Sequence, residues 1–370
     1  MTETGQFIPG MKLSEMFFRE EVEPQIKLVN PELKYSAGLL GPGSEVMGFD
    51  NAMSSDHHWG PRVMLFLSPQ DVEQMAGSLK SMLRHKLPHR FKGFPTSFTS
   101  AGVDPQNQGV QLLDYENQGP VNHRVEILSF RAYLKSYIDI DITKRMRACD
   151  WLSIPQQKLR SLKDGRLFRD NYNLQETLKK LEFYPHDLWL YLLASTWKRI
   201  EQEEHLMGRA GYVGDEIGSA LIAAKIVRDL MRLSFLMERT YFPYSKWFGT
   251  AFQKLAIASE LKGHLENTLA ATHWKEREEN LCRAYRVVAE WHNRLQITRL
   301  LPVVPKQFHD RPFKVISMGE FSRVIKEAIQ DHEVKELIHT KLFGNLDLVS
   351  DSTDISESSF ATGVFKELYL

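Results

Sequence analysis

The first 150 residues carry short apolar runs separated by stretches with a helical period. Apolar residues recur at helical spacing across residues 11–29, which predicts an amphipathic opening helix that stops near Pro31. Residues 35–40 and 63–67 are short apolar runs of the kind found in buried strands. The first run breaks at a Gly-Pro-Gly-Ser sequence, so we expect a tight turn directly after the first strand.

Two serine residues predict where further helices begin. Ser68 stands at an N-cap position, Pro69 follows at the first helical position, and apolar residues recur at intervals of three and four up to Pro88. Ser129 stands in the same way before a second helical stretch that reaches Tyr137. We therefore expect one helix after each serine.

The segment between these two helices predicts further strands. Residues 91–119 are rich in Gly, Pro, Ser and Asn, with short apolar runs at 94–98 and 110–113, and residues 125–128 form another apolar run. Strands alternating with helices are typical of an α/β architecture. We expect residues 1–150 to form an α/β (α+β) domain with a mixed sheet.

The helical period dominates the rest of the chain. Long periodic segments cover residues 187–207, 215–239, 246–262, 264–301 and 319–339. These segments predict an all-α helical bundle domain over residues 151–344. Residues 345–370 begin with an acidic stretch rich in Ser and Thr that has no period, so we expect a loop and C-terminal tail there.

The segment that starts at Asp215 is apolar around most of its circumference, which favours a central position in the bundle. One charged stripe remains on it, formed by Lys225, Arg228, Asp229 and Arg232. Such a stripe is usually the water-facing side of a helix, and it can instead line a binding cleft. The sequence leaves both interpretations open.

Composition indicates a folded protein with no large electrostatic field. Hydrophobic residues make up 42% of the 370 residues, and 47 basic residues balance 47 acidic ones. We therefore expect no general attraction to nucleic acid or to an anionic membrane surface, so an anionic ligand needs a local site. The two cysteines, Cys149 and Cys282, form neither a disulfide framework nor a zinc motif.

The chain has the features of a cytoplasmic protein. Its first thirty residues lack the basic, apolar and small-residue order of a secretion signal. The longest strongly apolar stretch, residues 188–194, is far shorter than the roughly 20 residues that span a bilayer. We expect neither export nor membrane insertion, and the sequence does not indicate an oligomeric state.

Candidate chemistry lies between the two predicted strands. Gly43 and Ser44 form a turn whose backbone amides and hydroxyl can hold the terminal phosphates of a nucleotide. Asp56 and His58 precede the second strand, and positions two apart on an extended strand face the same way, so both can address one Mg²⁺ ion. Glu126, on a neighbouring strand, is the candidate for the third metal ligand or the catalytic base.

Each of these residues also has a structural interpretation. A Gly-Pro-Gly-Ser sequence is most often an ordinary turn, and an acid such as Glu126 is often the solvent-facing member of an alternating strand. His57, His58 and His123 match no standard zinc spacing, so hydrogen-bonding roles are favoured for them.

These residues resemble the nucleotidyltransferase superfamily, in which Gly-Ser is followed after about ten to twelve residues by two acids and later by a third. Within it, the chain is similar to an uncharacterised family, the domain of unknown function 4037. The resemblance is carried by Gly43-Ser44-Glu45, Gly48-Phe49-Asp50, Ser54-x-Asp56-His57-x-Trp59-Gly60-Pro61-Arg62, Gly214-Asp215-Glu216-x-Gly218-Ser219, Pro243-Tyr244-Ser245-Lys246-Trp247-Phe248-Gly249-Thr250 and Asp351-Ser352-Thr353-Asp354.

The resemblance implies an adenylyltransferase-like enzyme in which the helical domain helps to hold the acceptor. It would move a nucleoside monophosphate, AMP in our hypothesis, from ATP or another nucleoside triphosphate to a hydroxyl of a small molecule. Gly43 and Ser44 would bind phosphate, Asp56, His58 and Glu126 would hold Mg²⁺, and Asp56 and Glu126 would act in catalysis. Lys246, at a predicted helix start, would reach the phosphates or the acceptor, whereas its structural interpretation is a solvated lysine.

One departure from the family pattern opens an alternative. His58 stands where the family usually has the second acid, and histidine prefers softer ions than Mg²⁺. The chain can therefore also be a catalytically weakened nucleotide sensor or interaction module. A third hypothesis, an RNA-acting or toxin-antitoxin-like helical domain, is disfavoured by the balanced charge.

Overall fold

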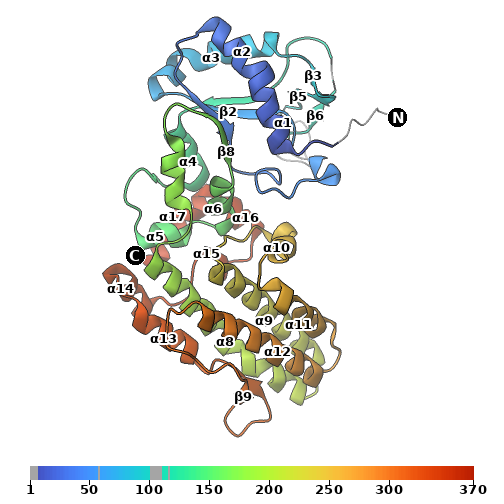
Figure 1. Ribbon diagram of the computed structural model, residues 1–370, viewed down its shortest axis with the longest axis vertical. Coiled ribbons are helices and arrows are strands. Elements are labelled where there is room, and N and C mark those ends of the chain that lie inside the picture. The colour runs from blue at the N-terminus through green and yellow to red at the C-terminus, as the bar shows by residue number, and fades with distance from the viewer. Residues whose placement is uncertain (1–6, 57–58, 101–110, 116) are drawn as a thin grey trace. The chain divides into compact units, whose positions relative to one another are not determined.

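A computed structural model of the chain describes residues 7–56, 59–100, 111–115 and 117–370, and at Ser55 and Asp56 it describes the backbone alone. The chain forms two compact units (Figure 1). The first unit comprises residues 1–145 and 158–182, and the second comprises residues 146–157 and 183–370. A mixed α/β N-terminal region is thus followed by a mainly helical C-terminal region.

The first unit is built on a four-stranded mixed sheet with the order β7-β2-β1-β8. Its strands are β1 (Ser36–Leu39), β2 (Arg62–Phe66), β7 (Arg124–Leu128) and β8 (Arg166–Asp170). β1 is antiparallel to both β2 and β8, whereas β2 and β7 run parallel. Every residue of β1 and β2 is buried, which confirms the interpretation of the two apolar runs as buried strands.

β8 has no counterpart among the predicted strands. It lies beyond residue 150, where the sequence pattern indicates helices, yet it pairs with β1 from Ser36↔Asp170 to Leu39↔Arg166. Only Phe168 is buried in this strand, and charged residues occupy both of its ends. A strand with one buried side chain leaves almost no hydrophobic signal in the sequence.

Helices cover both faces of the sheet. The opening helix consists of α1 (Gly10–Phe17), a π-helical turn (Phe18–Val22) and α2 (Glu23–Val29), in agreement with the predicted range. Pro24 has no N–H to donate, which explains why the regular hydrogen-bond ladder is interrupted at this point. Side chains of this helix, such as Leu13 and Phe17, share one core with Val63 and Leu65 of β2.

Both serine caps are confirmed. The hydroxyl of Ser68 accepts a hydrogen bond from the Asp71 amide at the start of α3 (Pro69–Lys86), and Ser129 accepts one from Ala132 at the start of α4 (Phe130–Ile138). α4 packs on the sheet face opposite α1, where the ring of Phe130 contacts Phe66.

The other elements of the first unit are short. They are β3 (Arg90–Phe91), β4 (Phe94–Pro95), β5 (Ser97–Phe98), β6 (Leu113–Asp114), two 3-10 turns (Ala52–Asp56 and Lys179–Leu181), α6 (Gln156–Lys163), which belongs to this unit from Lys158, and α7 (Leu174–Leu178). β3 pairs with β4 and β5 with β6, as antiparallel pairs, so strands occur within residues 91–119 as the composition predicts.

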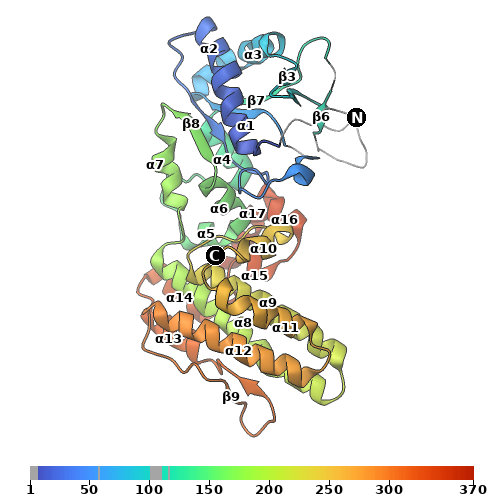
Figure 2. The same ribbon diagram turned by 45° about the vertical axis from the view of Figure 1, so that its right-hand side comes forward.

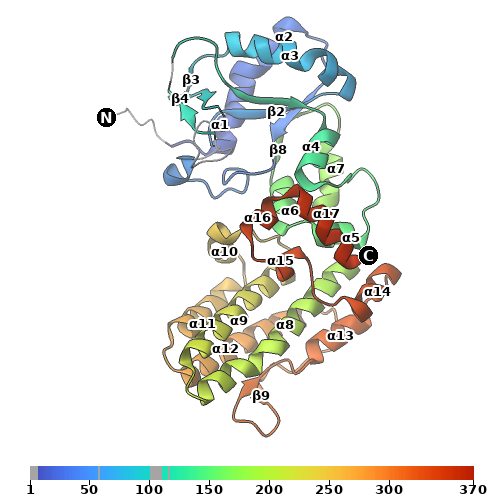
Figure 3. The same cartoon turned by 180° about the vertical axis from the view of Figure 1, so that it is seen from behind.

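Two long helices, α8 (His186–Tyr212) and α9 (Glu216–Met237), form the centre of the second unit and lie side by side (Figure 2). Around them lie α11 (Ala258–Ala270), α12 (Trp274–Arg294), α13 (Glu320–Ala328) and α14 (His332–Thr340) (Figure 3). The remaining elements are α5 (Ala148–Ser153), α10 (Ser245–Phe252), β9 (Lys306–Gln307), β10 (Lys314–Val315), α15 (Leu346–Val349), α16 (Thr353–Glu357), α17 (Ser359–Lys366) and a 3-10 turn (Glu367–Tyr369).

Several predicted helices are interrupted in the structure. Residues 246–262 divide between α10 and α11, residues 264–301 between α11 and α12, and residues 319–339 between α13 and α14. The expected loop and tail from residue 345 contains three short helices. No helix in the described ranges is both long and apolar enough to cross a membrane.

Candidate functional site

The predicted phosphate-binding turn lies at the end of the sheet where β1 ends and where β2 and β7 begin. Gly38 on β1 pairs with Met64 on β2, so the chain leaves β1 beside the start of β2. On the other side of β2, Arg62 pairs with Arg124 and Met64 with Glu126, both on β7. The turn after β1 therefore lies at the end of the sheet where β2 and β7 begin, and Glu126 lies at the middle of β7.

The turn requires glycine at Gly43. This residue has φ of +140°, which side-chain-bearing residues rarely adopt. A Cβ atom here would lie 2.5 Å from Nη2 of Arg62 and 2.5 Å from Oε2 of Glu45. Gly43 is therefore fixed both by its backbone conformation and by the close approach of a buried ion pair.

Arg62 ties the turn to β2. Its Nε donates to Glu45 at 2.9 Å and its Nη2 donates to the same carboxylate at 2.5 Å, while Nη2 also donates to the Pro42 carbonyl at 2.7 Å. Arg62 is 5% exposed and Glu45 is 3% exposed. The sequence analysis assigned no role to Arg62, although this residue ends the motif at residues 54–62 and is a charged residue at the start of an otherwise apolar strand.

A small cavity of about 70 Å³ opens between the turn, β2, β7 and α4. Pro42, Arg62, Arg124, Glu126 and Tyr133 contribute to its lining. Glu126 is half exposed, and one of its oxygens accepts a hydrogen bond from Nη2 of Arg124 at 3.3 Å. The cavity thus combines two guanidinium groups, which suit an oxyanion, with one carboxylate.

The Tyr133 hydroxyl adds an unused polar group to this cavity. Tyr133 is 5% exposed, and within the described ranges its hydroxyl oxygen has no hydrogen-bond partner. Burial raises the pKa of this phenol well above its ordinary value, and the nearby Tyr137 and Glu126 add to the effect. The hydroxyl is therefore a neutral, buried group beside Gly41.

Asp56 does not lie on an extended strand. Its backbone ends the 3-10 turn Ala52–Asp56, and β2 begins only at Arg62. The strand argument that aligned positions 56 and 58 is therefore wrong at Asp56, because Gly60 and Pro61 keep the strand from starting earlier. His58 lies outside the described residues, as does the side chain of Asp56.

Asp50 has a structural role in the loop before β2. One of its oxygens accepts hydrogen bonds from the Gly10 amide at 2.6 Å and from Nε1 of Trp59 at 3.0 Å. Trp59 itself is 2% exposed. Asp50 therefore fastens this loop to the first residue of α1.

Lys246 belongs to the second unit, whereas Gly43, Ser44 and Glu126 belong to the first. It is the second residue of α10, it is exposed, and its ammonium group lies 5.1 Å from the ring centre of Trp247. The preceding residue, Ser245, lines a larger cavity within the second unit.

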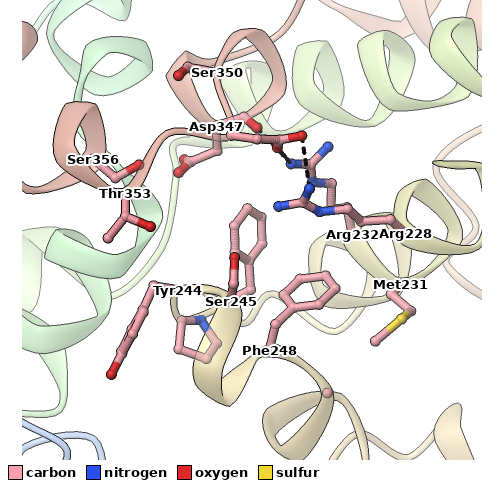
Figure 4. Close-up of a pocket in the computed structure, with 14 residues that line it drawn as sticks. Arg228, Met231, Arg232, Tyr244, Ser245, Phe248, Asp347, Ser350, Thr353 and Ser356 are labelled. Atoms are coloured by element: carbon pink, nitrogen blue, oxygen red, sulfur yellow. Dashed lines mark hydrogen bonds and ion pairs between the residues drawn. The ribbon is translucent and has the colours of Figure 1, made fainter. Parts of the chain in front are cut away.

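This second cavity measures about 360 Å³ and lies between α9, α10 and residues 347–356 (Figure 4). Its walls combine Met231, Phe242 and Phe248 with Arg228 and Arg232. The charged stripe on α9 is therefore divided between two environments. Lys225 is exposed, whereas Arg232 is 3% exposed and is not water-facing.

An exposed aspartate connects the two arginines at this cavity. Nη1 of Arg228 lies 2.8 Å from one carboxylate oxygen of Asp351, and Nη2 of Arg232 lies 2.8 Å from the other. Asp347, deeper in the cavity wall, accepts a hydrogen bond from the Gln156 amide at 2.9 Å. Burial raises the pKa of Asp347 to about 6, although the hydrogen bonds from Gln156 and Asn345 and the charge of Arg232 favour the ionised form.

The second cavity brings together two motifs that are far apart in sequence. The segment 243–250 supplies Ser245 and Phe248, and the segment 351–354 supplies Asp351 and Thr353.

Residues 151–248 match a family model. The model is described as Domain of unknown function (DUF4037). The chain matches no curated protein.

The DUF4037 match covers α8 and α9 and the first turn of α10. It therefore includes Arg228, Arg232 and Phe248, which line the second cavity. The Gly-Ser turn and Glu126 lie outside the matched residues, so the family match does not bear on the expected nucleotidyltransferase chemistry.

Proposed function

We propose that this chain is a Mg²⁺-dependent nucleotidyltransferase that moves a nucleoside monophosphate, AMP in our hypothesis, from a triphosphate to a hydroxyl of a small molecule. The observation that carries the proposal is the single cavity lined by Pro42 of the Gly-Ser turn and by Glu126 of β7. Phosphoryl transfer depends mainly on positioning and charge stabilisation, and this cavity offers groups of both kinds.

The arginines of the cavity would donate to the triphosphate, and each is already paired with a carboxylate, Arg62 with Glu45 and Arg124 with Glu126. Arg62 and Arg124 are adjacent across β2 and β7. Two neighbouring guanidinium groups repel each other, and burial together with the charge of Arg62 lowers the pKa of Arg124 below its usual value. A bound phosphate would relieve that repulsion, which favours an anion at this place.

Glu126 would accept the proton of the acceptor hydroxyl or complete the metal site. Its half-exposed carboxylate faces the cavity and is oriented by Arg124. The Tyr133 hydroxyl is a buried donor that a phosphate or acceptor oxygen would satisfy.

Magnesium would polarise the phosphorus and neutralise phosphate charge. The described carboxylates do not by themselves form its site, since Glu45 is engaged by Arg62 and Asp50 by Trp59. No group of three acidic, histidine or cysteine side chains in the described residues is arranged to hold a metal. In this proposal the metal therefore depends on Asp56 and position 58 together with Glu126.

Release of pyrophosphate from ATP tests the proposal. The full-length protein, incubated with ATP, Mg²⁺ and a mixture of hydroxyl acceptors, should release pyrophosphate, and Glu126→Gln should reduce the rate by about a hundredfold or more. Glu176→Gln is the matched control, because Glu176 is an exposed acid on α7 in the same unit. Equal rates for wild type and Glu126→Gln would remove the basis of the proposal.

A second candidate is a nucleotide-binding module without turnover. It is supported by the engagement of Glu45, Asp50 and Glu126 in contacts with other side chains. The variant His58→Asp separates the two candidates. An enzyme should gain Mg²⁺ affinity and turnover, whereas a binding module should gain no pyrophosphate release.

A further inference from the structure

The cavity of the second unit contains a buried arginine with an unmet donor. Arg232 donates from Nη1 to Asp229 at 3.1 Å and from Nη2 to the Asp347 carbonyl at 2.9 Å. Its Nε has no acceptor among the residues that the structure describes. An unpaired donor on a side chain that is 3% exposed costs free energy, and the guanidinium group of this side chain lines the cavity.

The carboxylate that pairs with both arginines belongs to an exposed side chain, that of Asp351. Asp351 pairs with both Arg228 and Arg232, yet its side chain is 62% exposed, in contrast to 1% for Asp229. Its carboxylate can therefore move into water at little cost. We propose that this cavity binds a phosphate monoester with an aromatic or apolar body, and that Asp351 holds the place of the phosphate when no ligand is bound.

The other polar groups of the cavity suit a phosphate better than a carboxylate. α10 begins at Ser245, which lines the cavity. The first amides of a helix lack partners within the helix and attract anions. Ser350 and Thr353 line the same space, as does Ser356, whose hydroxyl donates to the Ser352 carbonyl at 3.0 Å (Figure 4). A phosphate, with three terminal oxygens, offers these hydroxyls and the two guanidinium groups more acceptor sites than a carboxylate does.

The apolar walls define the rest of the ligand. Met231, Phe242 and Phe248 line the cavity and present carbon surface to it. A volume of about 360 Å³ falls within the usual range of small-molecule sites and has room for a phosphate and one ring. The site lies wholly in the second unit, so the inference does not depend on the nucleotidyltransferase proposal.

Phenyl phosphate is the simplest probe, because it joins the proposed anion to an aromatic ring. Calorimetry with the full-length protein in metal-free buffer should give saturable binding of one molecule per chain. Inorganic phosphate, which lacks the ring, and benzoate, which lacks the third oxygen, should each bind at least about tenfold more weakly. Absence of saturable phenyl phosphate binding overturns the proposal, and equal binding of benzoate overturns the assignment to phosphate.

Two substitutions test the location of the site. Gly249 lines the cavity, and no heavy atom of the described chain lies within 4 Å of a Cβ placed there, so Gly249→Leu should narrow the cavity without a clash. Gly263→Leu on α11 is the matched control, since a Cβ there is equally unobstructed and the residue does not line the cavity. Only Gly249→Leu should weaken phenyl phosphate binding, by about tenfold or more. An equal affinity for both variants would place the ligand elsewhere.

Two charge variants test the exchange with Asp351. Arg228→Gln should weaken phenyl phosphate binding about tenfold, because it removes one of the charge-assisted donors. Asp351→Asn should strengthen binding about tenfold, because it removes the competing charge. Unchanged affinity in Asp351→Asn would show that the aspartate does not hold the place of the phosphate. Circular dichroism of all four variants checks that each is folded.

Discussion

The guanidinium group of Arg62 and the carboxylate of Glu45 form a buried ion pair with two hydrogen bonds, at 2.9 and 2.5 Å. The pair joins the residue after the Gly-Ser turn to the first residue of β2. Arg62 also reaches the Pro42 carbonyl, so one side chain fixes both ends of the turn. The shape of the proposed phosphate site therefore depends on this contact.

Removal of one partner of this pair should destabilise the first unit. Arg62→Met leaves the Glu45 carboxylate buried without its partner, and we expect a loss of about 3–5 kcal/mol in the free energy of unfolding. The double variant Arg62→Met with Glu45→Leu should recover much of that loss. Urea unfolding, followed by fluorine NMR of fluorinated Trp59, measures both values. A double variant no more stable than Arg62→Met would contradict the ion-pair account.

Substitution of Gly43 should disturb the turn more than substitution of Gly48. Both glycines have positive φ, at +140° and +68°, but only the Cβ at Gly43 meets neighbouring atoms. We expect Gly48→Ala to cost about 1 kcal/mol through backbone strain, and Gly43→Ala to cost about 2 kcal/mol more because the Arg62 contact must shift. Thermal unfolding of the two variants compares them directly. Equal losses in the free energy of unfolding would show that the close approach at Gly43 does not add to the cost.

The stability of the first unit should fall in mild acid because of His123. Nδ1 of His123 accepts a hydrogen bond from the Val125 amide at 3.1 Å, and Nε2 lies 3.2 Å from the Lys80 carbonyl. Burial lowers the pKa of His123 to about 4, whereas an unfolded histidine titrates near 6.5. Between these values the unfolded chain binds a proton that the folded chain does not, so stability is present above about pH 6.5 and is lost as the pH falls toward 4.

His123→Asn tests this pH dependence, because asparagine keeps an acceptor for Val125 and cannot titrate. The free energy of unfolding of wild type should decrease by up to about 3 kcal/mol more than that of the variant between pH 7 and pH 4. His85→Asn, at an exposed position on α3, is the control and should keep the slope of wild type. A His123→Asn slope equal to that of wild type would rule out the assignment.

Glu204 should be needed to hold the segment between β10 and α13. Its carboxylate is 2% exposed and accepts hydrogen bonds from the amides of Ile316, Ser317 and Met318 at 2.7, 3.1 and 3.0 Å. Glu204→Ala leaves three buried amides without their acceptor, and we expect a loss of about 3 kcal/mol or more. Hydrogen exchange of residues 316–318 should accelerate in Glu204→Ala and remain unchanged in Glu203→Ala. Slow exchange in both variants would contradict this role.

Local patterns explain which parts of the fold the sequence predicts. Ser68 and Ser129 cap their helices as expected, because the hydroxyl and the amide that it binds are three residues apart. β8 escaped prediction because its pairing partner, β1, is about 130 residues away in sequence and its side chains are mostly polar. Sequence periodicity records which side chains are buried locally, and an edge strand buries few of them.

The candidate sites were only partly predictable for the same reason. Gly43 and Glu126 could be named from motif spacing, and the cavity beside the turn is lined by Glu126 and by Pro42, the neighbour of Gly43. Arg62 was named only within a motif and Arg232 only within a charged stripe, because the sequence does not show which charged residue has a buried partner. The partner of Arg232, Asp351, lies 119 residues away, and no pattern in the sequence connects the two.

The most direct test of the proposed nucleotidyltransferase is a crystal structure of the full-length protein with Mn²⁺ and a non-hydrolysable ATP analogue. The account predicts an anomalous Mn²⁺ peak within about 2.2 Å of carboxylate oxygens of Asp56 and Glu126, with the terminal phosphates against Gly43 and Ser44. A nucleotide bound away from this turn, or a metal held by other residues, would contradict it.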